Sequence, residues 1–152
     1  MNEKIRMAVI DDEPQVGDRL KQVFRRTGFE IETFLAGIPA LKRMEERPFH
    51  LVLTDIRLPD LDGLEVLKRI KKSHPHTEVI LITGYATLDQ AVEAMKKGAF
   101  YYLAKPFTPD QVRAVVKRAE EHIRISSENK MLRAEVAKNI RQEGIVGISS
   151  KI

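Results

Sequence analysis

Short apolar runs dominate the hydrophobic pattern of this chain, and each ends abruptly at a charged or hydroxylated residue. The runs cover 7–10, 51–54, 79–82 and 100–104. Runs of this length predict strands buried on both faces, as in a parallel sheet. The residues that follow them are Asp11 and Asp12, Asp55, Thr83 and Lys105. Because ligands bind outside the carboxyl ends of such strands, we expect these polar groups to meet at one edge.

Between the runs, apolar residues recur at helical spacing. The positions that mark four helices are Val16, Leu20, Val23 and Phe24; Leu41 and Met44; Leu64, Leu67 and Ile70; and Leu88, Ala91, Val92 and Met95. Gly28 is expected to close the first helix. Two capping boxes, Thr87 with Gln90 and Thr108 with Gln111, predict the starts of the last two helices.

The pattern predicts an α/β fold, because strands alternate with helices along the whole domain. A further strand is expected over 29–34, which brings the number of strands to five. Right-handed crossovers then place helices on both faces of a doubly wound parallel sheet. We expect a flavodoxin-like (βα)5 architecture with strand order 2-1-3-4-5 and an extended C-terminal coiled-coil helix.

That last helix is expected to be long, since 110–143 contain neither glycine nor proline. Its first apolar seam, which packing onto the sheet requires, comprises Val112, Val116, Ala119 and Ile123. A second seam in a different register comprises Ile125, Asn129, Leu132 and Val136. The second seam needs a partner helix, and Asn129 at an a-type position would set the register of a parallel dimer. A frayed, monomeric helix is the alternative.

Composition narrows the classes of function. The 152 residues carry a formal charge of +4, but 1–107 hold 17 Lys and Arg against 16 Asp and Glu, so no basic face for DNA binding is expected. Cysteine is absent, which excludes disulfides and thiolate metal sites. No apolar run approaches the roughly 20 residues of a membrane span, so a cytoplasmic protein without membrane contact is expected.

The polar strand ends suggest phosphoryl chemistry. Asp11, Asp12 and Asp55 would repel one another unless a divalent cation neutralised them, and hard oxygen ligands suit Mg2+. One carboxylate can then attack phosphorus to give an aspartyl phosphate. Lys105 can neutralise the phosphoryl oxygens, and Thr83 can donate a hydrogen bond to one of them. Taken alone, the pair Asp11 and Asp12 could be a helix cap, and Asp55 could be a turn residue. Polar residues at all four strand ends together favour the functional interpretation.

These residues resemble the receiver domain of two-component response regulators over roughly 4–123. The resemblance lies in four segments, Val9–Glu13, Asp55–Gly63, Thr83–Gly84 and Lys105–Phe107. It implies a phosphoacceptor switch rather than an enzyme with turnover, with a sensor histidine kinase as partner. Leu58 departs from the family pattern, in which methionine is commoner at this position.

The resemblance assigns a role to each site residue. Asp55 would accept the phosphoryl group, and Lys105 would bridge Asp55 and that group. The bond from Lys105 to Pro106 resembles the cis peptide of the family. The Mg2+ cofactor would be held by Asp55, by Asp12 directly, by Asp11 mainly through water, and by the backbone carbonyl of Arg57.

The resemblance also implies a switch. Thr83 would move toward the phosphoryl group, and Tyr102 would rotate inward behind it, biasing the face formed by the fourth strand, the fourth helix and the fifth strand. A tyrosine in an aromatic-rich strand can also be plain core. Arg57 and Tyr85 would flank the path of the hydrolytic water, so slow loss of the phosphoryl group is expected.

The C-terminal part resembles the linker of NtrC-type activators, which work with the sigma-54 polymerase. The matching segments are 129–133 and 145–149. This predicts a receiver over 1–123, a helical dimerisation linker over 124–143, and the start of a truncated AAA+ domain over 144–152. A homodimer is expected through the linker helix, through the face of the fourth helix and fifth strand, or both.

The predicted function is therefore a phosphorylation-controlled receiver that governs a downstream AAA+ transcription-activating ATPase. A stand-alone receiver that signals by protein contact is one alternative. A Mg2+-dependent aspartyl phosphatase is another alternative. Such enzymes carry an Asp-x-Asp motif on the first strand, whereas here Asp11 and Asp12 are adjacent.

Overall fold

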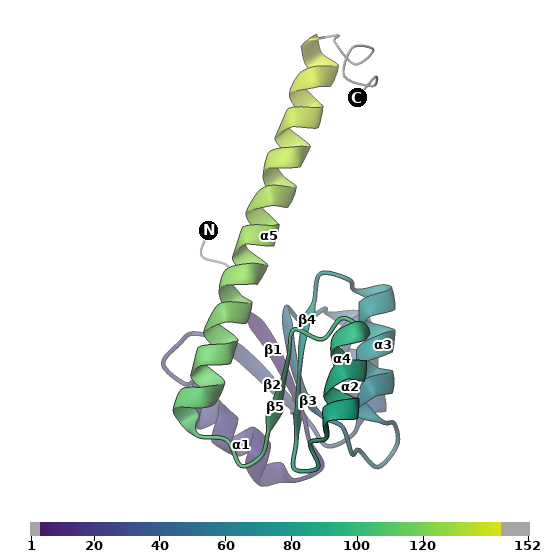
Figure 1. Cartoon of the computed structure of the whole chain (residues 1–152). Helices are drawn as coiled ribbons and strands as arrows, with labels where there is room; N and C mark the ends of the chain where they lie inside the picture. Colours follow the sequence, from purple (N-terminus) through teal and green to yellow (C-terminus); the bar gives the residue numbers. More distant parts are fainter. Residues whose placement is uncertain (1–3, 144–152) are drawn as a thin grey trace.

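The chain folds as a single parallel sheet between two layers of helices (Figure 1). This computed structural model describes residues 4–143, with side chains described for 4–126. The elements in chain order are β1 (Arg6–Ile10), α1 (Pro14–Val23), β2 (Glu30–Phe34), α2 (Gly37–Glu46), β3 (Leu51–Asp55), α3 (Gly63–Ser73), β4 (Glu78–Thr83), α4 (Leu88–Lys96), β5 (Tyr101–Ala104) and α5 (Pro109–Glu143). The strand order β2-β1-β3-β4-β5 confirms the predicted flavodoxin-like topology.

Alternation along the strands divides the apolar core into two parts. Met7 and Val9 of β1 pack toward α1 and α5, whereas Ala8 and Ile10 pack toward α2, α3 and α4. Successive strand residues point to opposite faces of a sheet, so a strand covered by helices on both sides must be apolar throughout. All residues of β1, β3 and β4 are buried, as the runs predicted.

The last run, 100–104, departs from that expectation. β5 begins at Tyr101 rather than Phe100, and Tyr101 is 37% exposed. The reason is that β5 lies at the edge of the sheet and pairs only with β4. Gly28 also departs from its predicted role, since α1 ends at Val23 and a turn intervenes before Gly28, whose φ is 81°.

Both predicted N-caps are present at the last two helices, but only the second forms a complete capping box. Thr87 Oγ1 accepts a hydrogen bond from the Gln90 backbone N–H at 3.1 Å. Thr108 and Gln111 make the full reciprocal pair, with their backbone N–H groups donating to each other's side-chain oxygens at 2.9 and 3.1 Å. These caps satisfy backbone donors that the first helical turn leaves free.

The first seam of α5 packs on the sheet, as predicted. Val112, Val116, Ala119 and Ile123 are all buried in the core shared with α1. His122 adds a polar contact, because its Nδ1 lies 2.5 Å from Oε2 of the buried Glu78 on β4. Figure 1 shows α5 continuing beyond the sheet after this contact.

The second seam is mostly beyond the described side chains. Ile125 is 56% exposed. Asn129, Leu132 and Val136 lie outside the residues whose side chains the structure describes, as does the whole segment 144–152. Dimerisation through this helix stays a prediction. Within the described residues, no helix is both long and apolar enough to cross a membrane.

A buried cation connects the far edge of the sheet to α2. The Arg6 side chain is 7% exposed and donates to Glu32 Oε2 at 2.8 Å, and Arg43 of α2 donates to Glu32 Oε1 at 2.9 Å. Hydrogen bonds from Arg43 lower the pKa of Glu32 below its ordinary value; partial burial opposes this effect and Arg6 reinforces it. Glu32 therefore stabilises the fold mainly when it is ionised.

Replacing Glu32 by Gln is expected to lower the free energy of unfolding by about 1 kcal/mol at neutral pH, because a buried guanidinium loses its counter-charge. A carboxyl with a lowered pKa contributes stability above its ordinary pKa and loses it as the pH falls through the folded-state value. The deficit should therefore shrink in acid. Urea denaturation at neutral and acidic pH measures it, with Glu30→Gln, whose pair with Arg47 is exposed, as the matched control.

Candidate functional site

The polar strand ends meet at one edge of the sheet, as predicted. Asp55 and Thr83 are the last residues of β3 and β4, and Asp11 and Lys105 directly follow β1 and β5. The strands are parallel and in register, with Ile10 paired to Thr54, Asp55 to Ile82, and Thr83 to Ala104. The topology alone therefore brings together residues that are up to 94 positions apart in the chain.

Lys105 lies between two buried carboxylates. Its Nζ is 2.7 Å from Asp11 Oδ2 and 3.1 Å from Asp55 Oδ2. A third carboxylate, Glu13 Oε1, lies 3.5 Å away. The Lys105–Pro106 peptide bond is cis. The three contacts with carboxylates place the ammonium group between the strand ends, within reach of the carboxylate expected to react.

The electrostatic balance of this cluster is incomplete. Burial raises the pKa of the Asp11 carboxyl above its ordinary value, although hydrogen bonds from Lys105 and the backbone of Glu13 oppose the rise. Burial by itself would lower the pKa of Lys105, but its contacts with Asp11 and Asp55 outweigh that effect and raise it. One ammonium therefore stays charged without fully compensating the carboxylates around it.

The remaining negative charge suits a divalent cation. One carboxylate oxygen from each of Asp11, Asp12 and Asp55 lies within 4.8 Å of the others, and Asp12 is exposed to solvent. Carboxylate oxygens with an open, water-accessible side are the ligands that Mg2+ prefers. The donor set present thus fits the predicted metal.

Backbone contacts position Asp55 and its carboxylate. The Arg57 backbone N–H donates to Asp55 Oδ1 at 3.3 Å, and the Gly63 N–H donates to the Ile56 carbonyl at 2.7 Å. A Cβ on Gly63 would collide with the Asp55 carbonyl oxygen, so only glycine permits this close approach. Asp62 then caps α3, accepting from the Leu64 N–H at 2.7 Å.

Sequence reasoning gave no role to two acidic residues near the site. Glu13 contacts Lys105, and its place directly after Asp11 and Asp12 was the available signal. Asp60 accepts hydrogen bonds from the Gly37 and Ile38 N–H groups at 2.8 and 2.7 Å. Asp60 therefore caps α2 from the loop that follows Asp55. The two segments are more than twenty residues apart, so no local sequence pattern predicts this contact.

Thr83 and Tyr102 occupy the positions from which a switch could read the site. Thr83 is fully buried, and its Oγ1 accepts a hydrogen bond from the Tyr85 N–H at 3.1 Å. Tyr102 is half-buried, and its hydroxyl donates to Gln90 Oε1 of α4 at 3.4 Å. The Arg57 guanidinium carbon lies 3.6 Å from the centroid of the Tyr85 ring.

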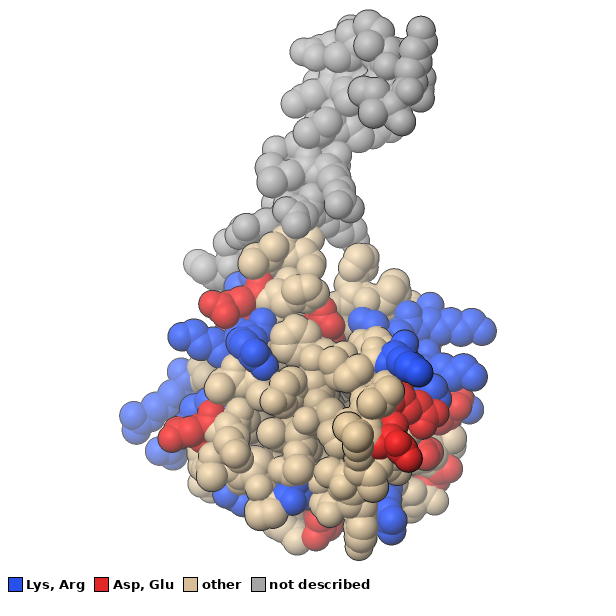
Figure 2. Space-filling view, in the orientation of Figure 1, with Lys and Arg blue, Asp and Glu red and all other residues tan. Residues whose placement is uncertain are grey.

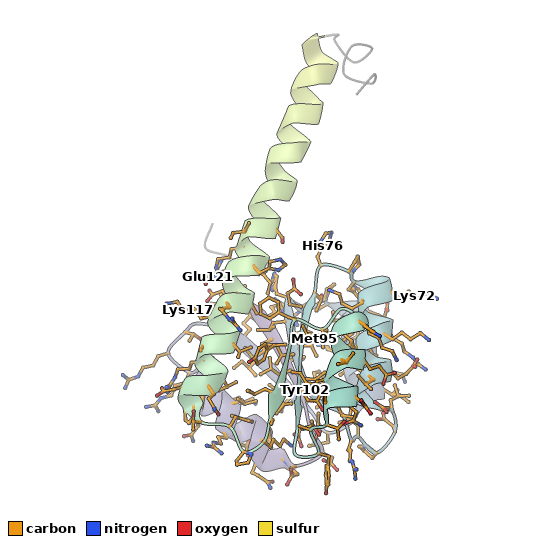
Figure 3. All side chains as sticks on the ribbon, in the orientation of Figure 1. Lys72, His76, Met95, Tyr102, Lys117 and Glu121 are labelled. Atoms are coloured by element: carbon orange, nitrogen blue, oxygen red, sulfur yellow. The ribbon has the colours of Figure 1, made fainter. Side chains whose placement is uncertain are left out.

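The α4 helix exposes the apolar positions that mark it in the sequence. Leu88, Val92 and Met95 are 78%, 44% and 49% exposed, whereas Ala94 is buried. A small residue lets the helix approach the sheet, and its larger apolar side chains then face solvent. Figure 3 shows Met95 and Tyr102 on neighbouring elements, α4 and β5. Figure 2 shows the centre of this face free of charge, with charged side chains at its rim.

Curated relatives share the described domain but are much longer. The chain is 37% identical over 124 residues to the transcriptional regulatory protein ZraR of Klebsiella oxytoca, covering 82% of this chain and 28% of ZraR. It is 40% identical over 114 residues to the DNA-binding transcriptional regulator NtrC of Escherichia coli K12, covering 75% of this chain and 24% of NtrC. The chain thus spans about a quarter of the length of these relatives.

Solved structures agree with the fold. NtrX from Brucella abortus, in complex with ADP, superposes with a TM-score of 0.78 at 33% identity, covering 86% of this chain and 30% of NtrX. The beryllofluoride-activated NtrC4 receiver domain dimer gives a TM-score of 0.73 at 35% identity, covering 77% of this chain and 98% of that domain. Residues 7–117 match the family described as the response regulator receiver domain. The chain therefore belongs to the response regulator receiver domain family.

Proposed function

We propose that Asp55 accepts a phosphoryl group from a sensor histidine kinase and that this event sets the state of the domain. The observation that carries the proposal is the bridge from Lys105 Nζ to both Asp11 and Asp55. This bridge places the Lys105 ammonium beside Asp55, the carboxylate that ends the central strand β3. The carboxylate oxygens of Asp11, Asp12 and Asp55 remain as candidate ligands for a metal. The family membership supports the same assignment.

In the proposed step, a carboxylate oxygen of Asp55 attacks phosphorus of a phosphohistidine. The phosphorus–nitrogen bond breaks, the acyl phosphate forms, and the released imidazole takes up a proton. The Lys105 ammonium is close enough to Asp55 to pair with the new phosphoryl oxygens and to balance their charge. Mg2+, held by Asp11, Asp12, Asp55 and the Arg57 carbonyl, would neutralise charge on the same oxygens.

Replacing Asp55 by Asn should abolish phosphoryl uptake from acetyl phosphate, because the amide is not a nucleophile at neutral pH. Intact mass and phosphate-affinity electrophoresis measure the uptake, with Mg2+ present or removed by chelation. Asp89→Asn, which removes an exposed carboxylate of α4, is the control and should retain uptake. Undiminished uptake by the Asp55→Asn variant, or uptake without any divalent metal, would contradict the assignment.

The phosphoryl state is proposed to control pairing through the exposed face of α4 and β5. The Thr83 hydroxyl lies at the end of β4 beside the reacting edge, and Tyr102 connects β5 to α4 through Gln90. Moving Thr83 toward a phosphoryl oxygen would free the space that Tyr102 needs to turn inward. The apolar stripe of Leu88, Val92 and Met95 supplies a surface for a second copy.

Light scattering of the chain with and without beryllofluoride should therefore show a change of oligomeric state or of dimer arrangement. Thr83→Ala should bind the phosphoryl mimic yet lose this response, because no hydroxyl remains to move toward the mimic and donate a hydrogen bond to it. Thr83→Ser keeps the hydroxyl and should respond. A monomer in both states would refute control by pairing, and a normal response of Thr83→Ala would refute the role of Thr83.

Beyond the described domain, we propose an NtrC-type role in the cytoplasm. The long α5 would act as a dimerisation linker to a AAA+ ATPase that activates transcription with the sigma-54 polymerase. The similarity to ZraR and NtrC and the coverage of NtrX by this chain support that proposal. They favour it over a stand-alone receiver.

The Arg57–Tyr85 pair should slow loss of the phosphoryl group. The Arg57 guanidinium carbon lies 3.6 Å from the centroid of the Tyr85 ring, and we expect this pair to obstruct the path of the hydrolytic water. Arg57→Ala is expected to hydrolyse severalfold faster, and the unaltered chain should hold its phosphoryl group for minutes or longer. Timed loss of phosphate after removal of acetyl phosphate measures this, with Arg69→Ala on α3 as the control. A half-life of seconds for the unaltered chain would overturn the expectation.

A further inference from the structure

A basic groove lies between the C-terminal end of α1 and the first turns of α5. Its cavity volume is about 580 Å³. The walls are residues 22–27 with Phe29 on one side and Arg113, Val116, Lys117 and Glu120 on the other. None of these residues belongs to the phosphorylation site, and the groove opens on the sheet face opposite α2, α3 and α4.

The floor of the groove is apolar and aromatic. The half-buried Val23 and Phe29 line its surface, and the ring of Phe29 stacks on that of the buried Phe24 with centroids 5.8 Å apart. Such a floor favours a flat, apolar group, because ring faces gain contact area and lose water on binding. A purely ionic ligand would not use it.

The walls carry basic side chains, most of which have no carboxylate partner among the described residues. Among the residues with described side chains, Arg25, Arg26 and Lys117 make no ion pair, whereas Arg113 pairs with Asp110 at 3.0 Å. The one carboxylate of the groove, Glu120, is already engaged by Arg124 at 2.9 Å. The groove therefore presents free positive charge from both walls above an apolar floor.

We propose that this groove binds a small molecule that joins an anionic group to a planar apolar body. The anionic group, a carboxylate, sulfonate or phosphate, would pair with Arg25 and Arg26, and the planar body would lie on Val23 and Phe29. A volume of about 580 Å³ lies in the range of small-molecule sites. Nucleic acid instead requires a basic stripe across a wide surface.

The site can be tested on the full chain with two probes of similar shape. Anilinonaphthalene sulfonate carries the anionic group, and phenylnaphthylamine is its neutral counterpart. Fluorescence titration should show saturable binding of the sulfonate at one site per chain, with the neutral probe weaker by roughly tenfold or more, as expected for loss of a charge-assisted contact. Amide shifts on binding should concentrate at 22–29 and 113–120.

Paired variants separate the groove from general surface charge. Arg25→Gln with Arg26→Gln should raise the dissociation constant of the sulfonate probe roughly tenfold. Lys68→Gln with Lys72→Gln on α3 changes the net charge equally and should leave the constant unchanged. Figure 3 shows Lys72 on the far side of the domain from Lys117. All four side chains are exposed, and circular dichroism would check that the fold is retained.

Several results would overturn the proposal. Equal affinity for the charged and neutral probes would show that the cations do not contribute. An equal loss in the α3 variant would show unspecific attraction, and shifts confined to α4 would place the probe on the apolar stripe instead. Binding of a polyglutamate peptide without binding of the sulfonate probe would identify the groove as a protein-docking surface.

Discussion

The contact on which the site depends is the ammonium of Lys105 held between Asp11 and Asp55. Carboxylates brought this close and buried this deeply would repel one another if no cation separated them. Lys105 relieves part of that repulsion, although burial still raises the pKa of the Asp11 carboxyl above its ordinary value. Because one ammonium faces the carboxylates of Asp11, Asp12 and Asp55, the site has a shortage of positive charge. That shortage suits the proposed metal, and the same lysine would hold the proposed phosphoryl group.

In the proposed switch, parallel topology would convert this local balance into a signal. Because β1, β3, β4 and β5 end at one edge, a change of charge there would act on four strands together. Thr83 ends the strand next to β5, and Tyr102 connects β5 to α4 through its hydrogen bond to Gln90. The opposite end of β4 contacts α5 through Glu78 and His122. The proposed signal could therefore pass to the α4 face or to the long helix.

The sequence was sufficient for the topology and for the meeting of Asp11, Asp12, Asp55, Thr83 and Lys105 at one edge of the sheet, because burial on both faces makes parallel strands visible as apolar runs. It was insufficient for the exposure of Leu88, Val92 and Met95, since helical spacing alone does not say which apolar face meets the sheet. The Asp60 cap and the Glu78–His122 contact join distant segments and depend on the folded arrangement. The Gly63 requirement is likewise visible only from its approach to Asp55.

The coupling between Asp55 and the α4–β5 face is tested most directly by NMR. Beryllofluoride and Mg2+ are added to the chain, and the shifts of its backbone amide resonances are recorded. If the charge at Asp55 is read through Thr83 and Tyr102, shifts should extend from the loops around Asp11, Asp55 and Lys105 along the end of β4 into α4 and β5. Shifts confined to the loops that contact the ligand, with α4 and β5 unchanged, would contradict the coupling.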